Sequence, residues 1–241
     1  MSSKGVLITG ASSGLGKYIA ATMPFHVSYD RDKPNEYVGP YDLIIHCACN
    51  PARDNLYEAY SNVRLLDELL NIQTKKFVFI SSADVYPKGG NRSEDTAIDF
   101  RKIDNLYGQM KFLCEGIIRN REQEHLILRP TGLLGSYCRN NIIVRMLEGC
   151  DATTLREDSR MSYISHSYLY DLIFSELQGT YNISSLDSMT LGEINDMLGN
   201  PITEFGEYFG RFGEMDLSKL RRAGYTFPTC GRVIREFGVS R

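Results

Sequence analysis

The chain has 241 residues, of which 42% are hydrophobic and 24% charged, and its formal net charge is −3. This length allows one large domain or two small ones with a sizeable core. The weak negative charge argues against nucleic acid or an anionic membrane as the main partner. No apolar run approaches the roughly 20 residues that a membrane span needs.

The cysteines and histidines exclude two further classes of protein. The six cysteines are scattered, mostly in apolar surroundings, which favours reduced thiols over a disulfide framework. The four histidines show no metal-type spacing, so no metal site is predicted. Residues 1–4 lead straight into a predicted strand without a signal-peptide pattern, so we expect a cytoplasmic protein.

A glycine-rich loop dominates the N-terminal region. Residues 5–8 predict a strand and residues 17–21 a helix. This strand–turn–helix context is that of a dinucleotide fingerprint, in which glycines let the backbone approach a pyrophosphate at the helix N-terminus. A P-loop is excluded, because Tyr18 follows Lys17 where Ser or Thr is required and the glycine spacing is one residue too long. The cofactor-binding candidates here are Gly10, Ser12, Ser13, Gly14, Leu15 and Gly16.

The next segment bears on the choice of cofactor. Residues 25–29 predict a second strand that ends at Asp30. An acidic residue in this place binds ribose hydroxyls and favours NAD, whereas the adjacent Arg31 could meet the 2′-phosphate of NADP; a solvated turn is the alternative. The strand predicted at residues 41–48 follows so soon that a usual crossover helix or strand is missing. Cys47 and Cys49 on it are interpreted as packing residues.

The central stretch carries the candidate chemistry. Residues 77–80 predict a strand buried on both faces, and Ser82 stands just beyond its carboxyl end, where open α/β sheets bind ligands. Tyr107 and Lys111 share one face of a helix predicted at residues 106–118. An ammonium about 4 Å from a phenol is worth about 4 kcal/mol, enough to lower a pKa of about 10 by about 3 units. We therefore expect proton transfer by Tyr107 coupled to hydride transfer, with Ser82 holding the substrate oxygen; an exposed Tyr/Lys pair is the alternative.

The other predicted elements alternate between helix and strand. An amphipathic helix is expected at residues 58–72, and short strands at 126–128, 163–164 and 181–183. Further helices are expected around Met146 and at residues 168–177, 191–198 and 218–223. Thr190 and Glu193 predict a capping box at the start of the helix at 191–198.

The glycine loop, Ser82, Tyr107 and Lys111 together resemble the short-chain dehydrogenase/reductase superfamily. Over nearly the whole chain, local motifs are similar to its extended branch, the NAD-dependent epimerase/dehydratase family that acts on nucleotide sugars. The matching motifs are IHCA at 45–48, YSNV at 60–63, SSADVY at 81–86, LRPTGLLG at 128–135 and DLSKLRRAGY at 216–225.

The resemblance implies a fold, a cofactor and partners. It implies an α/β unit over residues 1–241, with a Rossmann-type doubly wound parallel sheet mainly in 1–134 and 161–183 and a small C-terminal substrate lobe mainly in 135–160 and 184–241. It implies a homodimer formed through the helices at 58–72 and 106–118. The implied cofactor is NAD, with NADP as the alternative, and its further contacts are Cys47, Ala48, Asn62, Ile80, Tyr107, Lys111 and Pro130.

The implied substrate is a nucleotide-linked sugar. Asn140, Asn141 and Arg160 look like the contacts to its phosphates; a surface loop without a binding role is the alternative. The chain departs from the family pattern in its TGxxxGxG spacing, in Gly132 replacing a substrate-facing Asn, and in Tyr168 replacing an Asp. Ala83 stands where dehydratases carry an acid, so no dehydratase activity is expected. Asp84 is a candidate acid/base residue, or a polar residue at a strand end.

Three functions stay open at this stage. The chain could be an epimerase that regenerates its own cofactor, or a reductase of 4-keto sugars that consumes NAD(P)H. It could also be a non-catalytic dinucleotide-binding regulator or scaffold.

Overall fold

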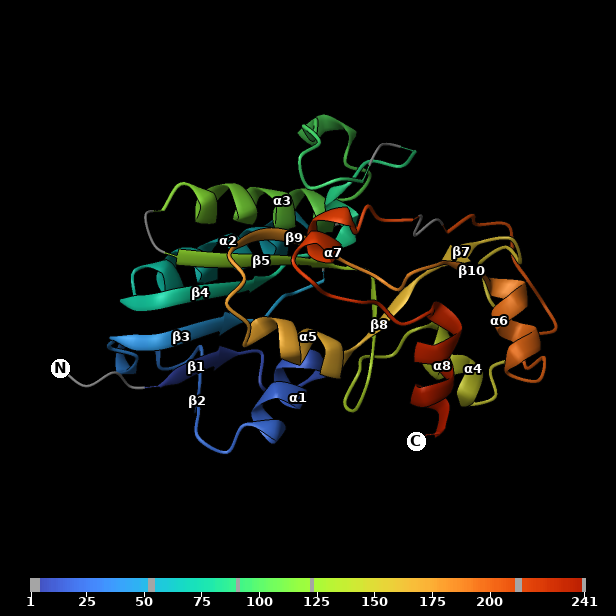
Figure 1. Cartoon of the computed structure of the whole chain (residues 1–241), viewed down its shortest axis with the longest axis horizontal. Coiled ribbons are helices and arrows are strands. Elements are labelled where there is room, and N and C mark those ends of the chain that lie inside the picture. The colour runs from blue at the N-terminus through green and yellow to red at the C-terminus, as the bar shows by residue number, and fades with distance from the viewer. Residues whose placement is uncertain (1–4, 52–54, 90–91, 122–123, 211–213, 240–241) are drawn as a thin grey trace.

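The computed structural model describes residues 5–51, 55–89, 92–121, 124–210 and 214–239, and a parallel β-sheet forms its centre (Figure 1). The six strands lie in the order β2-β1-β3-β4-β5-β9. The chain moves outward from β1 to β2 and then returns to β3 on the other side of β1, which creates the switch point of a Rossmann-type sheet. The expected fold class is confirmed. The strands are β1 Val6–Thr9, β2 Val27–Ser28, β3 Tyr41–His46, β4 Thr74–Ile80, β5 Glu124–Pro130 and β9 Gly179–Ile183.

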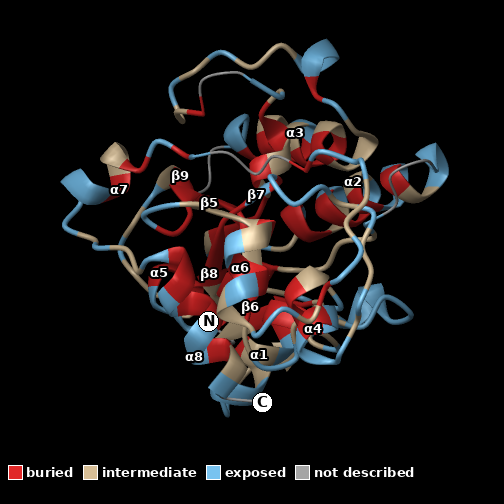
Figure 2. Ribbon diagram, turned by 90° about the vertical axis from the view of Figure 1, so that its right-hand side faces the viewer, coloured by how far each residue is buried: buried red, intermediate tan, exposed pale blue. Residues whose placement is uncertain are grey.

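Helices cover both faces of the sheet, because alternate side chains along each strand point to opposite sides. One apolar core joins Ile8, Ile45 and Val78 to helices α1 (Gly14–Thr22) and α5 (His166–Ile173). The other joins Leu7 and Phe77 to helices α2 (Leu56–Leu70) and α3 (Leu106–Arg119). Figure 2 shows the buried residues gathered along the sheet and the inner sides of these helices.

The connection from β2 to β3 is short, as the sequence predicts. It contains only the 3₁₀ turn η1 (Pro34–Glu36). The strand order places β2 at the edge of the sheet. The predicted second strand was too long at its start, since β2 has two residues and Phe25 is 89% exposed. Pairing with β1 involves only Val27 and Ser28, which leaves Phe25 without a sheet neighbour or a core to pack against.

The remaining elements pack beside the carboxyl end of the sheet. Strand β6 (Gly132–Leu134) pairs with β8 (Tyr163–Ser165), and β7 (Arg160–Met161) pairs with β10 (Met189–Thr190). Helices α4 (Ile142–Leu147), α6 (Leu191–Met197) and α8 (Cys230–Val239) share an apolar cluster, and α7 (Ser218–Arg222) contacts β9. The capping box of α6 is confirmed, and α5 ends earlier than predicted, at Ile173. Strands β6, β7 and β10 and helix α8 were not predicted.

The described helices include none whose length and apolar character would let it cross a bilayer. Within the same residues there is no group of three or more His, Cys, Asp or Glu side chains arranged to hold a metal ion.

Candidate active site

Two adjoining cavities lie where strands of the sheet end. The first, which we call the catalytic cavity, has a volume of about 290 Å³ and is lined by residues that follow β1, β3, β4 and β5. The second, the distal cavity, has a volume of about 400 Å³ and shares Asn141 with the first. Ser82, Tyr107 and Lys111 all line the catalytic cavity, so the structure brings the predicted trio together.

Ser82 and Lys111 are fixed by backbone contacts at the end of β4. Ser82 caps the 3₁₀ turn η2 (Ala83–Val85), and its Oγ accepts a hydrogen bond of 3.1 Å from the backbone N–H of Asp84. The buried Lys111 ammonium donates to the Ile80 carbonyl at 2.6 Å and lies 5.8 Å from the centroid of the Tyr107 ring. The hydrogen bond to the end of β4 thus holds the Lys111 ammonium beside the Tyr107 ring.

A glycine brings helix α3 close enough to place Tyr107 beside Ser82. A methyl group at Gly108 would come within 2.1 Å of the Asp84 carbonyl oxygen, so only glycine allows α3 to approach η2 this closely. The Asn105 side chain caps the helix by accepting from the Gly108 N–H at 2.8 Å. Gly108 and the Asn105 cap therefore define where helix α3 starts.

The electrostatics of Tyr107 differ from the sequence-based estimate. Burial raises the pKa of Tyr107 above its usual value, although the Lys111 charge and the Ser82 hydroxyl both lower it. Burial also disfavours the charge of Lys111, but neighbouring Cys49 and Tyr107 outweigh it and keep the pKa of that ammonium above its usual value. The prediction of a lowered Tyr107 pKa was wrong, because it included the attraction of the Lys111 ammonium and omitted the desolvation of the phenolate. Tyr107 is protonated at neutral pH in this state of the cavity.

His46 provides a pH-dependent contribution to stability beneath the cavity. Its Nδ1 lies 2.8 Å from Thr9 Oγ1, and burial together with the nearby Lys111 lowers its pKa from 6.5 to about 3. Between these two values the unfolded chain binds a proton that the folded chain does not, so stability falls as the pH drops below 6.5. We expect His46 to account for about 2 kcal/mol of the loss between neutral pH and about pH 5.

Urea unfolding of the wild type and of His46→Gln at both pH values measures this contribution. The variant should lose about 2 kcal/mol less on acidification than the wild type. Equal losses in the two proteins would contradict a buried neutral imidazole.

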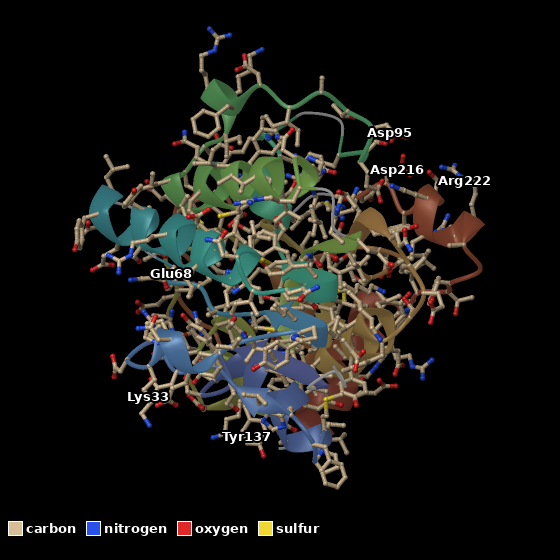
Figure 3. The ribbon with its side chains drawn as sticks, turned by 90° about the vertical axis from the view of Figure 1, so that its left-hand side faces the viewer. Lys33, Glu68, Asp95, Tyr137, Asp216 and Arg222 are labelled. Carbon is tan, nitrogen blue, oxygen red and sulfur yellow. The ribbon has the colours of Figure 1, made fainter. Side chains whose placement is uncertain are left out.

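The glycine loop packs against the strand ends and its helix N-terminus faces the catalytic cavity. Gly10 has φ +74°, and a methyl group on it would come within 2.8 Å of the Ala48 nitrogen. Gly14 donates its N–H to the Tyr137 carbonyl at 2.8 Å, and Figure 3 places Tyr137 beside α1. Thr131 lines the cavity, and its hydroxyl is buried without a hydrogen-bond partner among the described residues. The Gly14 N–H at the helix N-terminus and the unpaired Thr131 hydroxyl are groups that can hydrogen-bond the phosphate and amide groups of a dinucleotide.

The predicted cofactor contacts divide into those that line the catalytic cavity and those that do not. The lining set is Ser13, Gly14, Leu15, Gly16, Cys47, Ile80, Tyr107, Lys111 and Pro130. Outside the lining are Gly10, Ser12, Ala48, Asn62, Asp30 and Arg31.

Three of the outlying residues have other contacts. Asn62 is buried, and its Oδ1 accepts from the Asn50 N–H at 2.7 Å, which holds the loop after β3. Asp30 is exposed and accepts from the Asp32 N–H at 3.0 Å. Arg31 lines a separate cavity of about 280 Å³ against α2. The structure therefore does not bring the two cofactor-selectivity candidates to the catalytic cavity.

Cys47 and Cys49 pack against the two apolar cores, as predicted, but they do not lie on a strand. Strand β3 ends at His46, so both cysteines lie beyond it, and both line the catalytic cavity together with Cys138. Burial raises the pKa of the Cys47 thiol to about 12, which keeps it neutral.

Of the predicted substrate contacts, Arg160 is the one that lines neither cavity. Asn141 caps α4 and lines both cavities, and Asn140 lines the catalytic cavity. Arg160 is exposed and its Nη1 reaches Ser188 Oγ at 3.1 Å, because alternation along β7 turns Met161 inward instead. The prediction that Arg160 faces the substrate phosphates is not supported by this placement.

The structure also places Gly132, a departure from the family pattern, and Asp84, the acid/base candidate. A methyl group on Gly132 would come within 2.5 Å of the Tyr163 ring, so this ring fills the space that a larger side chain at position 132 would need. Asp84 lines the distal cavity rather than the catalytic one.

Several residues of the site were missed. Tyr86, Arg92 and Tyr208 line the distal cavity, and Arg139 and His166 line the catalytic one. The buried pair of Arg129 and Glu115 was also missed. Each is a charged residue within an otherwise apolar strand or helix face, and because buried charges require partners, this pattern could have indicated the pair.

Comparisons with known proteins agree with this architecture. The sequence model of the NAD dependent epimerase/dehydratase family matches residues 29–162, a stretch that contains Ser82, Tyr107 and Lys111 but not the glycine loop. UDP-N-acetylglucosamine 4-epimerase from Methanobrevibacter ruminantium M1, in complex with UDP-N-acetylmuramic acid, is 16% identical with a TM-score of 0.79, over 99% of this chain and 98% of that one.

Two other solved structures have the same overall fold. UDP-glucuronic acid 4-epimerase from Bacillus cereus, in complex with UDP-glucuronic acid and NAD, is 16% identical over 98% of both chains, with a TM-score of 0.80. dTDP-4-dehydrorhamnose reductase from Bacillus anthracis, in complex with NADP, is 20% identical over 100% of both chains, with a TM-score of 0.75. At these identities the likeness concerns the fold.

Proposed function

Since the chain belongs to the NAD-dependent epimerase/dehydratase family, we propose that it is an NAD(P)-dependent enzyme that oxidises or reduces a carbon of a nucleotide-linked sugar. The observation that carries this proposal is that Ser82, Tyr107 and Lys111 line one cavity together with the glycine loop. A non-catalytic binding protein needs no such trio.

The three side chains have complementary roles. Tyr107 exchanges a proton with the substrate oxygen, Ser82 donates a hydrogen bond to that oxygen, and Lys111 stabilises the phenolate by its charge. A bound nicotinamide dinucleotide supplies the hydride acceptor or donor. Because the phenol is protonated in the present cavity, Tyr107 is ready to donate in the reductive direction; accepting a proton near neutral pH requires a further positive charge nearby.

The cofactor would lie along the N-terminus of α1. Gly14 and Leu15 would hold the pyrophosphate, and Thr131, whose hydroxyl has no hydrogen-bond partner among the described residues, would be available to the cofactor. The Tyr137 carbonyl would have to leave the Gly14 N–H when the pyrophosphate binds.

A reductase of 4-keto sugars is the second candidate. The short β2–β3 connection favours it, as does the match over the full length of the dTDP-4-dehydrorhamnose reductase chain, whose structure contains NADP. The epimerase candidate is favoured by the matches to two 4-epimerases over nearly their whole chains.

The experiment that tests the function is to release and identify the nucleotide that copurifies with the protein, and then to scan nucleotide sugars by thermal shift. Retained NAD and stabilisation by a UDP-, GDP- or dTDP-sugar would support an epimerase. An empty protein stabilised by NADPH and by a 4-keto sugar nucleotide would support a reductase. A protein that responds to no dinucleotide would refute both.

We also propose that the protein is a homodimer formed through α2 and α3. These two helices pack side by side, and they expose apolar side chains to solvent: Leu56, Tyr57, Tyr60 and Leu113. We expect sedimentation equilibrium to give twice the chain mass, and the double variant Tyr57→Glu/Tyr60→Glu to give a folded monomer. A monomeric wild type would contradict this interface.

A further inference from the structure

The wall of the distal cavity formed by β7 and β8 is mainly apolar. Met161 and Tyr163 line it, with Leu155 beside them, and Arg160 points away toward Ser188. Among the described residues, this wall contributes no cation. A diphosphate carries charge that needs Arg, Lys or backbone donors, so this wall is a poor place for one.

The described cations of the distal cavity lie on a different segment. Lys88 and Arg92 both line the cavity and follow η2 in the chain. Arg92 is only 8% exposed, whereas Lys88 is exposed at the rim, where its ammonium lies 5.8 Å from the centroid of the Tyr208 ring. A buried guanidinium that borders a cavity can donate two hydrogen bonds to the oxygens of a phosphate or carboxylate, and little water competes with that ligand.

The backbone of Arg92 is anchored on both sides. Its carbonyl accepts from Asn182 Nδ2 at 2.7 Å and from the Asp216 N–H at 3.1 Å. Asn182 is itself fully buried and accepts from the Tyr86 hydroxyl at 2.9 Å. These bonds tie the backbone of Arg92 to β9 and to Asp216, at the border of the distal cavity.

Two carboxylates also line the distal cavity. Asp104 is exposed, and its Oδ2 already accepts from the Lys88 N–H at 3.0 Å. Asp84 lies two residues after Ser82 in the chain. The lining of the cavity thus combines two carboxylates with the buried Arg92.

We propose that Arg92, assisted by Lys88, binds the diphosphate of the substrate, in the role that the sequence motif suggested for Arg160. The inference rests on the proposed function, because it takes a nucleotide-linked sugar as the occupant of the distal cavity. It assigns the diphosphate to the segment after η2 and leaves the apolar wall of Met161 and Tyr163 for rings of the substrate.

Isothermal titration of the wild type and of Arg92→Gln with UDP, UDP-glucose and UDP-glucuronate tests the assignment. NAD binding is measured on the same samples to show that the variant is folded. We expect Arg92→Gln to bind all three ligands about 10- to 100-fold more weakly and to bind NAD as the wild type does. Arg92→Lys should recover part of the loss, and Lys88→Gln should weaken binding less than Arg92→Gln does.

The matched control is Arg101→Gln, which removes an exposed arginine paired with Asp99 and should bind as the wild type does. Unchanged UDP binding in Arg92→Gln would overturn the assignment, as would a comparable loss in Arg160→Gln alone. A loss confined to UDP-glucuronate would place Arg92 against a sugar carboxylate and also overturn it. If the wild type binds NAD but no UDP-, GDP- or dTDP-sugar, the proposed function itself fails, and the assignment with it.

Discussion

Replacing Tyr107 by Phe is expected to lower turnover of the nucleotide-sugar substrate by about 10²- to 10⁴-fold, the usual range for a positioned acid or base. The substitution removes only the hydroxyl and keeps the ring beside Lys111. Because the lost interaction acts mainly in the transition state, cofactor binding should stay within about twofold of the wild type.

Turnover is measured by mass spectrometry of the nucleotide sugar, and cofactor affinity by fluorescence titration. Tyr170→Phe is the matched control, since that ring packs against Tyr18 and Phe174 and lines neither cavity. A Tyr107→Phe protein with wild-type turnover would show that another group transfers the proton.

Replacing Glu115 by Ala is expected to have the largest effect on stability, about 3–5 kcal/mol, because it leaves a buried arginine unpaired. The carboxylate of Glu115 has no exposure and accepts two hydrogen bonds from Arg129, at 2.9 and 2.6 Å, and one from Arg119 at 2.9 Å. Arg129 also donates to the Tyr86 hydroxyl at 2.6 Å. The network connects α3 and β5 to the residues beneath the distal cavity.

Urea unfolding gives the free energy of unfolding for the wild type, Glu115→Ala and the control Glu68→Ala. Glu68 pairs with Arg64 on the exposed side of α2, so its loss should cost less than about 1 kcal/mol. A Glu115→Ala variant as stable as the control would contradict the importance of the buried pair.

The central sheet and the placement of Ser82, Tyr107 and Lys111 in one cavity were predictable, because both follow from local patterns. The apolar run at residues 77–80 needs burial on both faces, and a strand end followed by serines marks the carboxyl edge of a parallel sheet. The i, i+4 spacing places Tyr107 and Lys111 on one helix face whatever the rest of the chain does.

The parts that could not be predicted depend on contacts between distant segments. Which of Arg160 and Met161 faces the cavity depends on the register of β7 with β10, and a shift by one residue reverses it. The direction of the Tyr107 pKa depends on how far the folded chain buries the phenol. Arg92 borders the distal cavity where Asn182 of β9 and Asp216 hold its carbonyl, and both residues are far from position 92 in the sequence.

The most direct test of the proposed chemistry is to mix the protein carrying its nicotinamide cofactor rapidly with nucleotide sugars and to follow the absorbance of the reduced nicotinamide. We expect a transient or net change in the cofactor's redox state with a UDP-, GDP- or dTDP-sugar in the wild type, and none in Tyr107→Phe. If cofactor and nucleotide sugar both bind but neither is oxidised or reduced, the trio of Ser82, Tyr107 and Lys111 does not catalyse hydride transfer.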